Sequence, residues 1–227
     1  APQQLRADHN KIIAFAQDTL ANDFRRAQVF AVRDAAAQHP DIAFLYTDAK
    51  GQTSLLIRHI EQLISAKVDV LIVGTNDAEA VVPVVSKAHR AGIPVIILDR
   101  GIASTEYTSF INSDNLKIGV MAAEYIAQLL KGKGTVLLFE GLPKADVTQL
   151  RTRGFLETMD NHPKIKVVRR VGNYLRRNAI LEMEKLINEG IHIDAIFSES
   201  DSMLSGIRSA MKRHQIAPST IYMVGCD

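Results

Sequence analysis

An aspartate and an arginine stand side by side directly after an apolar segment of the chain. The segment PVIILD is typical of a buried strand, and it ends at Asp99, followed by Arg100 and Gly101. A carboxylate and a planar guanidinium that are partly removed from water can each hold two neighbouring hydroxyls of a polyol. The same pair could instead be a salt bridge that fixes a hinge or a helix end. The two residues alone leave both interpretations open.

Polar side chains also follow the other predicted strands. In an open parallel sheet, ligands bind outside the carboxyl ends of the strands, so residues at these positions gather at one edge. Besides Asp99 and Arg100, the strand-end residues are Gln17, Asp18, Asp48, Asn76, Asp77, Glu140, Asn173, Ser200, Asp201 and Asp227. This pattern favours a binding site for a small polar molecule.

The elements that must position these residues alternate along the whole chain. Apolar runs typical of strands are followed by amphipathic segments with helical spacing. Strands are predicted at 11–17, 42–49, 68–75, 94–99, 134–141, 166–172, 194–200 and 220–225. Helices are predicted at 24–38, 54–66, 78–91, 113–130, 149–161, 177–190 and 201–214. This alternation predicts an α/β fold with two doubly wound parallel-sheet lobes, 11–112 and 113–227, and a ligand cleft between them.

Composition and motifs exclude several classes of protein. The net charge of +2 is small, and the basic residues are dispersed among acidic ones, which argues against nucleic acid as a partner. No apolar run approaches the roughly 18 to 20 residues that span a bilayer. The single Cys226 forms no disulfide or metal-ligand pattern. The polar opening APQQLRADHN lacks the pattern of a signal peptide and is compatible with the removal of a leader by processing.

Catalytic motifs are also missing from the sequence. There is no G-x-S-x-G elbow and no G-x-G-x-x-G after a strand, and the GKGT at 132–135 precedes a strand instead of following one. A carboxylate held by an adjacent arginine is a poor general base, because the cation favours its ionised form. We therefore expect no enzyme activity, no catalytic residues, no metal and no cofactor.

Several segments resemble the periplasmic sugar-binding proteins of ABC transporters, the family with the type I periplasmic binding fold that includes ribose-binding proteins. The similarity is carried by TDAKGQTSLLIRHIEQLISAKVDVLIVGTNDAEAVVPVVSKAHRAGIPVIILDRGI, INSDNLKIG, RTRGF, FSESDSMLSGI and VGCD. The order and spacing of these segments are specific together, and they extend from Lys11 to Asp227.

The resemblance implies a set of ligand-binding residues. Asp99 and Arg100 match a pair that clamps sugar hydroxyls, and Arg151 matches an arginine that reaches in from the second lobe. Asp227 matches a carboxylate that binds hydroxyls. The remaining matches are Asn22 and Phe24, where the family usually reads Asn-Pro-Phe-Phe; Arg25, in place of the second aromatic; Tyr174, as an aromatic wall; and Ser200, in place of an asparagine.

Two departures set this chain apart from the best-known members. Arg25 resembles family variants that recognise other sugars, such as galactofuranose, so plain ribose is not the expected ligand. Family members also usually continue past the VG-x-D segment and return to the first lobe, whereas the sequence ends at Asp227. We therefore expect the family's C-terminal return segment to be missing here.

The resemblance implies a monomeric solute-binding protein that closes its two lobes over a sugar or polyol and presents it to the membrane permease of an ABC transporter. The implied location is the periplasm, or the cell exterior with a lipid anchor. Two alternatives stay open: the sugar-sensing domain of a lactose-repressor-type regulator, and that of a membrane signalling receptor. The regulator needs a helix-turn-helix before the first strand, for which the opening ten residues are too few.

Overall fold

The computed structural model describes residues 11–227, and the polar opening segment lies outside this range. The chain divides after Ser113 into two compact units, each with its own sheet. We refer to the part before this point as unit 1 and to the part after it as unit 2.

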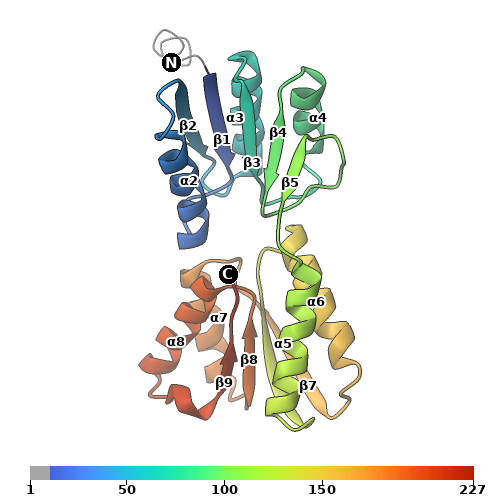
Figure 1. The fold of residues 1–227 in the computed structure, drawn as a ribbon. Helices are drawn as coiled ribbons and strands as arrows, with labels where there is room; N and C mark the ends of the chain where they lie inside the picture. The colour runs from blue at the N-terminus through green and yellow to red at the C-terminus, as the bar shows by residue number, and fades with distance from the viewer. Residues whose placement is uncertain (1–10) are drawn as a thin grey trace. The chain divides into compact units, whose positions relative to one another are not determined.

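Unit 1 is a parallel sheet of five strands in the order β2-β1-β3-β4-β5 (Figure 1). Its strands are β1 Lys11–Gln17, β2 Ile42–Asp48, β3 Val70–Gly74, β4 Val95–Leu98 and β5 Ser109–Ile111. Its helices are α2 Asp23–Ala36, α3 Thr53–Ser65 and α4 Val82–Arg90. Alternate residues of β1 point to opposite faces: Ile12 packs in the cluster that holds α3 and α4, and Phe15 packs against α2. Helices therefore cover both faces, as a parallel sheet requires.

Unit 2 repeats this plan with four parallel strands in the order β7-β6-β8-β9 (Figure 1). Its strands are β6 Gly134–Glu140, β7 Ile165–Val171, β8 Ala195–Ser198 and β9 Tyr222–Val224. Its helices are α5 Asn115–Leu129, α6 Asp146–Met159, α7 Arg176–Asn188 and α8 Asp201–Arg213, with a short 3₁₀ turn at Pro218–Thr220. Leu137 faces the core under α7 and α8, and Val136 faces the core under α5 and α6.

In each unit, an aspartate forms hydrogen bonds with the backbone at the amino ends of the central strands. In unit 1 the backbone N–H of Ile12 donates to Asp69 Oδ2 at 2.8 Å, and the N–H of Asp69 donates back to the carbonyl of Ile12 at 2.9 Å. In unit 2, Thr135 and Asp194 form the same two bonds, both at 2.8 Å. We call each reciprocal pair an aspartate clamp. It satisfies backbone groups at the strand starts, at the edge opposite the strand-end residues.

The predicted fold class of two α/β parallel-sheet lobes is confirmed. One strand was not predicted: β5 is three residues long at the sheet edge and has no apolar run. The helix predicted at 78–91 begins only at Val82; residues 78–81 before it form a turn, in which Asp77 Oδ1 accepts the N–H groups of Glu79 and Ala80.

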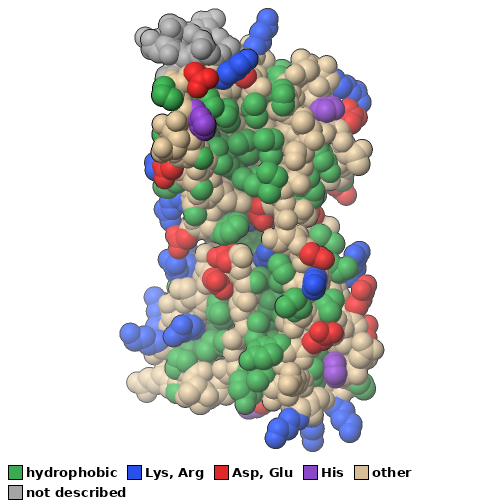
Figure 2. All heavy atoms as spheres, in the orientation of Figure 1, with side chains coloured by type: hydrophobic (Ala, Val, Ile, Leu, Met, Phe, Trp, Pro, Cys, Tyr) green, Lys and Arg blue, Asp and Glu red, His purple; other side chains and the backbone are tan. Residues whose placement is uncertain are grey.

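The surface of the described residues carries charges of both signs. On the face shown in Figure 2, acidic and basic side chains occur on each unit. Within residues 11–227, no helix combines the length and the hydropathy that a membrane span needs.

Candidate ligand-binding site

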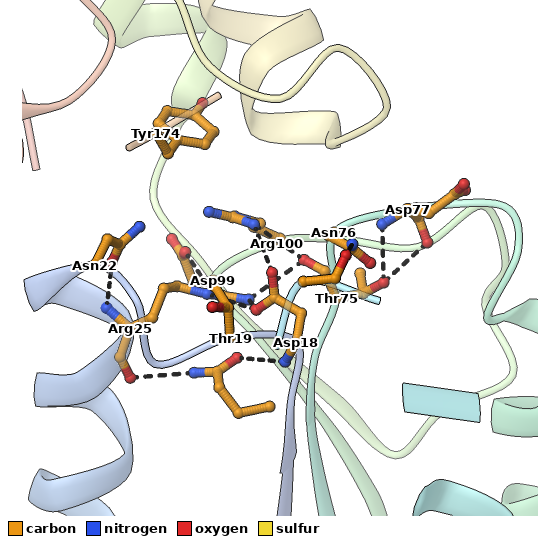
Figure 3. A network of polar contacts seen from close by, with 12 residues as sticks. Asp18, Thr19, Asn22, Arg25, Thr75, Asn76, Asp77, Asp99, Arg100 and Tyr174 are labelled. Atoms are coloured by element: carbon orange, nitrogen blue, oxygen red, sulfur yellow. Dashed lines mark hydrogen bonds and ion pairs between the residues drawn. The ribbon is translucent and has the colours of Figure 1, made fainter. Parts of the chain in front are cut away.

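Arg25 lies at the centre of a buried polar cluster in unit 1 (Figure 3). Asn22 begins α2 by accepting the N–H of Arg25 on Oδ1 at 2.7 Å, and this cap fixes Arg25 in the first turn. The side chain of Arg25 is 1% exposed. Its five N–H groups form five hydrogen bonds with four acceptor atoms: Asp18 Oδ1, which accepts two, Gln28 Oε1, Asp99 Oδ2 and the carbonyl oxygen of Thr75. Arg25 therefore positions the groups around it.

Asp18 is shared between two arginines. Its Oδ1 accepts Nε and Nη2 of Arg25 at 2.9 and 2.6 Å, and its Oδ2 accepts Nη1 of Arg100 at 3.2 Å. Nη1 of Arg100 also approaches the carbonyl of Thr75 at 3.4 Å. Asp18 and Arg100 are 1% and 3% exposed. Such buried charges are tolerated only because they are paired and hydrogen-bonded.

A tight turn after β4 brings Asp99 and Arg100 into the same cluster. Asp99 has a positive φ of 68°, and the N–H of Arg100 donates to the carbonyl of Leu98 at 2.9 Å. Asp99 Oδ2 lies 3.3 Å from Nη1 of Arg25, and the Asp99 side chain stays 18% exposed. The Asp-Arg pair is thus a part of the strand-end cluster and not an isolated surface salt bridge.

Gly74 makes room for this cluster at the end of β3. A Cβ at this position would lie 2.0 Å from Gln17 Oε1 and 2.9 Å from Arg25 Nη2. Gln17 in turn accepts the N–H of Asp18 on Oε1 and donates to the carbonyl of Arg25. Glycine is therefore required so that the β3 backbone can pass close to the buried side chains.

Asn22 caps α2 beside the cluster, and Phe24 lies in the first turn of α2, next to Arg25 in the sequence. In Figure 3 the amide nitrogen of Asn22 points away from the helix, and the oxygen is used by the cap. Phe24 is half-buried and belongs to none of the apolar clusters found among the described residues. An amide donor and an aromatic ring next to paired charges provide the groups that bind a polar ring with an apolar face.

In unit 2, a close contact between α5 and α6 positions Arg151. A Cβ on Gly119 would lie 2.1 Å from the carbonyl oxygen of Arg151, and a Cβ on Gly154 would lie 2.2 Å from that of Leu116. The two glycines thus let the helix backbones touch. Arg151 is 7% exposed, and its Nε donates to Asn115 Oδ1 at 2.9 Å while Nη1 donates to the carbonyl of Glu199.

Tyr174 and Ser200 are held by the structure of unit 2. Tyr174 is 4% exposed, its ring lies against Gly141, and its hydroxyl accepts a hydrogen bond from Thr148 at 2.8 Å. Ser200 caps α8, since its Oγ accepts the N–H of Met203 at 3.2 Å. Asp227 is exposed. The ligand contacts of these three residues stay predictions.

Glu199, between β8 and α8, was not predicted as a site residue. It is fully buried, its Oε2 accepts the N–H of Gly141 at 3.0 Å, and Oε1 lies 2.5 Å from Thr152 Oγ1. Burial raises the pKa of its carboxyl to about 8. Of the unit 1 cluster, Asp18 was predicted only as a strand-end residue. The sequence offered no signal for Glu199, because its burial results from packing.

The charges of the unit 1 cluster are paired within the cluster itself. The two arginines and two aspartates of unit 1 balance in charge, and each carboxylate is tied to a guanidinium. Among residues 11–227, no group of three or more His, Cys, Asp or Glu side chains could hold a metal ion.

Comparisons with known proteins agree with this geometry. A family model described as a periplasmic binding protein domain matches residues 13–227. The chain is 30% identical over 218 residues to the ribose import binding protein RbsB of Haemophilus influenzae, covering 95% of this chain and 72% of that protein. It spans 59% of the corresponding protein of Bacillus subtilis, to which it is 32% identical over 184 residues that cover 81% of this chain.

Two solved structures are similar throughout the chain. One is an ABC transporter solute-binding protein from Bacillus halodurans with bound myo-inositol, with a TM-score of 0.90 and 26% identity, covering 97% of this chain and 77% of that one. The other is the fructose-binding periplasmic domain of the hybrid two-component system BT1754, with a TM-score of 0.88 and 28% identity, covering 96% and 72%.

Proposed function

Because this chain belongs to the periplasmic binding protein domain family, we propose that it is a solute-binding protein that captures a small sugar or polyol for an ABC transporter. The observation that carries the proposal is the buried cluster of Asp18, Arg25, Asp99 and Arg100 at the strand ends of unit 1. Paired charges that are already fixed in place bind hydroxyls with little loss of entropy. Similar proteins include a ribose import binding protein and a solute-binding protein with bound myo-inositol.

The proposed ligand residues come from both units. In unit 1 they are Asn22, Phe24, Asp99 and Arg100, with Arg25 and Asp18 holding the charged groups in register. In unit 2 they are Arg151, Tyr174, Ser200 and Asp227. A ligand that contacts the proposed residues of both units favours a conformation that the ligand-free protein populates less. A membrane permease can recognise this conformation.

A screen of ligand classes tests this proposal. We expect a pentose, hexose, furanose, cyclitol or alditol to raise the melting temperature and to give a saturable calorimetric isotherm. A thermal shift with amino acids or nucleotides, and none with any sugar or polyol, would contradict it. Arg100→Ala and Arg151→Ala should each lower the affinity for the same ligand. If only one of the two variants loses affinity, the proposal that both units contribute ligand contacts is contradicted.

We further propose that the protein is monomeric and is located in the periplasm, or outside the cell with a lipid anchor. It has no enzyme activity and does not bind nucleic acid specifically. Chromatography of the ligand after long incubation should return it unchanged. Salt-resistant, sequence-dependent binding to duplex DNA would favour a transcription regulator instead.

A sensor domain is the second candidate, and the similarity to the fructose-binding domain of a two-component system favours it. Both candidates bind the same class of ligand, so the screen does not separate them. Reconstitution with a permease does: stimulation of its ATPase activity by the liganded protein supports the transport role, whereas signalling in cells without the permease supports the sensor.

A further inference from the structure

One hydroxyl group lies between two glutamates in unit 2. Thr152 Oγ1 is 3.0 Å from Glu140 Oε1 and 2.5 Å from Glu199 Oε1. A threonine hydroxyl carries a single proton, so it donates to only one of the two carboxyls. The other carboxyl must then donate to Thr152, and for that it must itself carry a proton.

The surroundings decide which glutamate carries the proton. Glu140 accepts Nε and Nη2 of Arg169 at 2.9 and 2.7 Å, so its negative charge is neutralised by a bidentate pair. Glu199 is fully buried, and the N–H of Gly141 donates to its Oε2. Burial disfavours the ionised form of Glu199 and raises its pKa to about 8, with Glu140 adding to the rise and Thr152 and Gly141 opposing it.

The charged groups that act on Glu199 are Glu140 on β6, Arg151 on α6 and Arg169 on β7, and the Arg169 charge is already paired with Glu140. Asp201 on α8 and Asp227 act on the neighbouring Cys226. Cys226 is also near and stays protonated over the neutral range, because burial raises its pKa to about 11.

Glu199 is joined to two residues of the proposed ligand site. Its carbonyl accepts a hydrogen bond from Nη1 of Arg151, and the next residue, Ser200, caps α8. The side chain of Glu199 anchors this short segment through Gly141 at the end of β6 and Thr152 on α6. A change at its carboxyl is therefore passed to Arg151 and Ser200 through the backbone.

We propose that Glu199 is a positioning residue that carries a proton in the working protein, donates it in a hydrogen bond to Thr152, and thereby holds Arg151 and Ser200 in their binding geometry. In this chain of hydrogen bonds, the O–H of Glu199 donates to Thr152, and the O–H of Thr152 donates to the Glu140 carboxylate. No covalent bond is broken, and no proton leaves this set of three hydrogen-bonded side chains. The binding part of this inference rests on the proposed function, whereas the proton and the coupling to Arg151 do not.

Carboxyl NMR of the full chain tests the proton without any ligand. Wild type labelled at the glutamate carboxyl carbons should show one carboxyl that titrates near pH 8, and this signal should be absent in Glu199→Gln. It should persist in the control Glu124→Gln, which changes an exposed glutamate on α5. The Nε–H signal of Arg151 should shift with the same midpoint in wild type and stay constant in Glu199→Gln. A Glu199 carboxyl that titrates below pH 6, or an Arg151 signal that ignores it, overturns the proposal.

Affinity for the sugar or polyol found in the screen tests the role in binding. Wild-type affinity should fall by up to about tenfold per pH unit above pH 8, where Glu199 loses its proton. Glu199→Gln should keep the affinity of wild type at pH 7 within about threefold and flatten the profile, because an amide mimics the protonated acid. Glu199→Ala should lose affinity at every pH. A Glu199→Gln variant that binds the ligand much more weakly than wild type at pH 7 contradicts the proposal. If no sugar binds while the NMR titration appears, the proposed function fails and the proton assignment stands.

Discussion

The guanidinium of Arg25 contacts one carboxylate oxygen of Asp18 twice, through Nε at 2.9 Å and through Nη2 at 2.6 Å. Its other N–H groups reach Gln28, Asp99 and the carbonyl of Thr75. Arg25 is thus saturated by protein acceptors. Its effect on a ligand must pass through Asp18 and Asp99, whose orientation it fixes.

Arg25 and Arg100 should therefore differ when replaced by alanine. Arg25→Ala removes the main partner of a buried carboxylate and should lower the free energy of unfolding by about 3 to 5 kcal/mol. Arg100→Ala should lower it much less, because Asp18 keeps Arg25. It should instead cost roughly 2 to 5 kcal/mol of binding free energy, and Asp99→Asn should weaken binding by less. Urea unfolding and calorimetry measure the two quantities. An Arg100→Ala variant that is destabilised but binds the ligand with wild-type affinity contradicts the assignment of Arg100 to the ligand site.

Gly74→Ala should disrupt the cluster from the backbone side. The new Cβ lies 2.0 Å from Gln17 Oε1, so Gln17 and Arg25 must shift. We expect a loss of about 1 to 3 kcal/mol in stability, together with weaker ligand binding. The control is Gly92→Asn, because no atom lies within 4 Å of a Cβ there, and asparagine is among the side chains that the positive φ of 81° strains least. Equal melting temperatures for the two variants would show that the cluster tolerates the added atom.

Phe24→Ala should weaken ligand binding with little effect on stability. The ring of Phe24 is half-buried but lies outside the apolar clusters of the described residues. Phe30→Ala is the matched control on the same helix, because Phe30 packs against the cluster of Phe15, Val29 and Ile72. We expect Phe30→Ala to lower the melting temperature and to leave affinity nearly unchanged. If Phe24→Ala lowers the melting temperature and keeps the affinity, while Phe30→Ala lowers the affinity, Phe24 is not a ligand residue.

Asp194 should make stability depend on pH at the acid end. The N–H of Thr135 lowers the pKa of Asp194, with burial opposing and His192 adding to the effect. Because the folded pKa lies below the unfolded one, the stabilisation is complete above the unfolded value of about 3.9 and is lost as the pH falls through the folded value. Asp194→Ala should cost about 1 kcal/mol at pH 7, and this difference from wild type should shrink as the pH falls through the folded pKa of Asp194.

The control for this prediction is Glu157→Ala, which breaks an ion pair with Arg153 whose two side chains are more than half exposed. It should change stability by well under 1 kcal/mol. Urea unfolding from pH 2 to pH 7 measures both variants. A difference between wild type and Asp194→Ala that stays constant over this range would contradict the clamp as an electrostatic contact.

The regular elements could be predicted because their apolar periodicity is strong. The buried strand β4 and the helix α3 are readable in this way. The edge strand β5 could not be predicted, because it is only three residues long and has no apolar run. The start of α4 was placed too early, because the turn over 78–81, capped by Asp77, has the same local sequence pattern as the first turn of a helix.

The candidate site was predictable in position but not in its internal order. Strand ends indicated Asp18, Asp99 and Arg100, because parallel strands bring them to one edge. That all five donors of Arg25 are engaged by protein atoms depends on contacts with residues up to 74 positions away. The burial of Glu199 likewise depends on α6 and β6, which no local pattern near Glu199 reveals.

The aspartate clamps separate what holds each sheet from what recognises a ligand. Asp69 and Asp194 act at the amino ends of the strands, whereas Asp18, Arg100 and Ser200 follow the carboxyl ends. Loops at the carboxyl ends can therefore be exchanged without disturbing the strand starts, provided that the buried Asp18–Arg25 pair is kept. This makes the chain a suitable scaffold for biosensor engineering, in which new specificity is grafted onto one edge of each sheet while the opposite edge is kept intact.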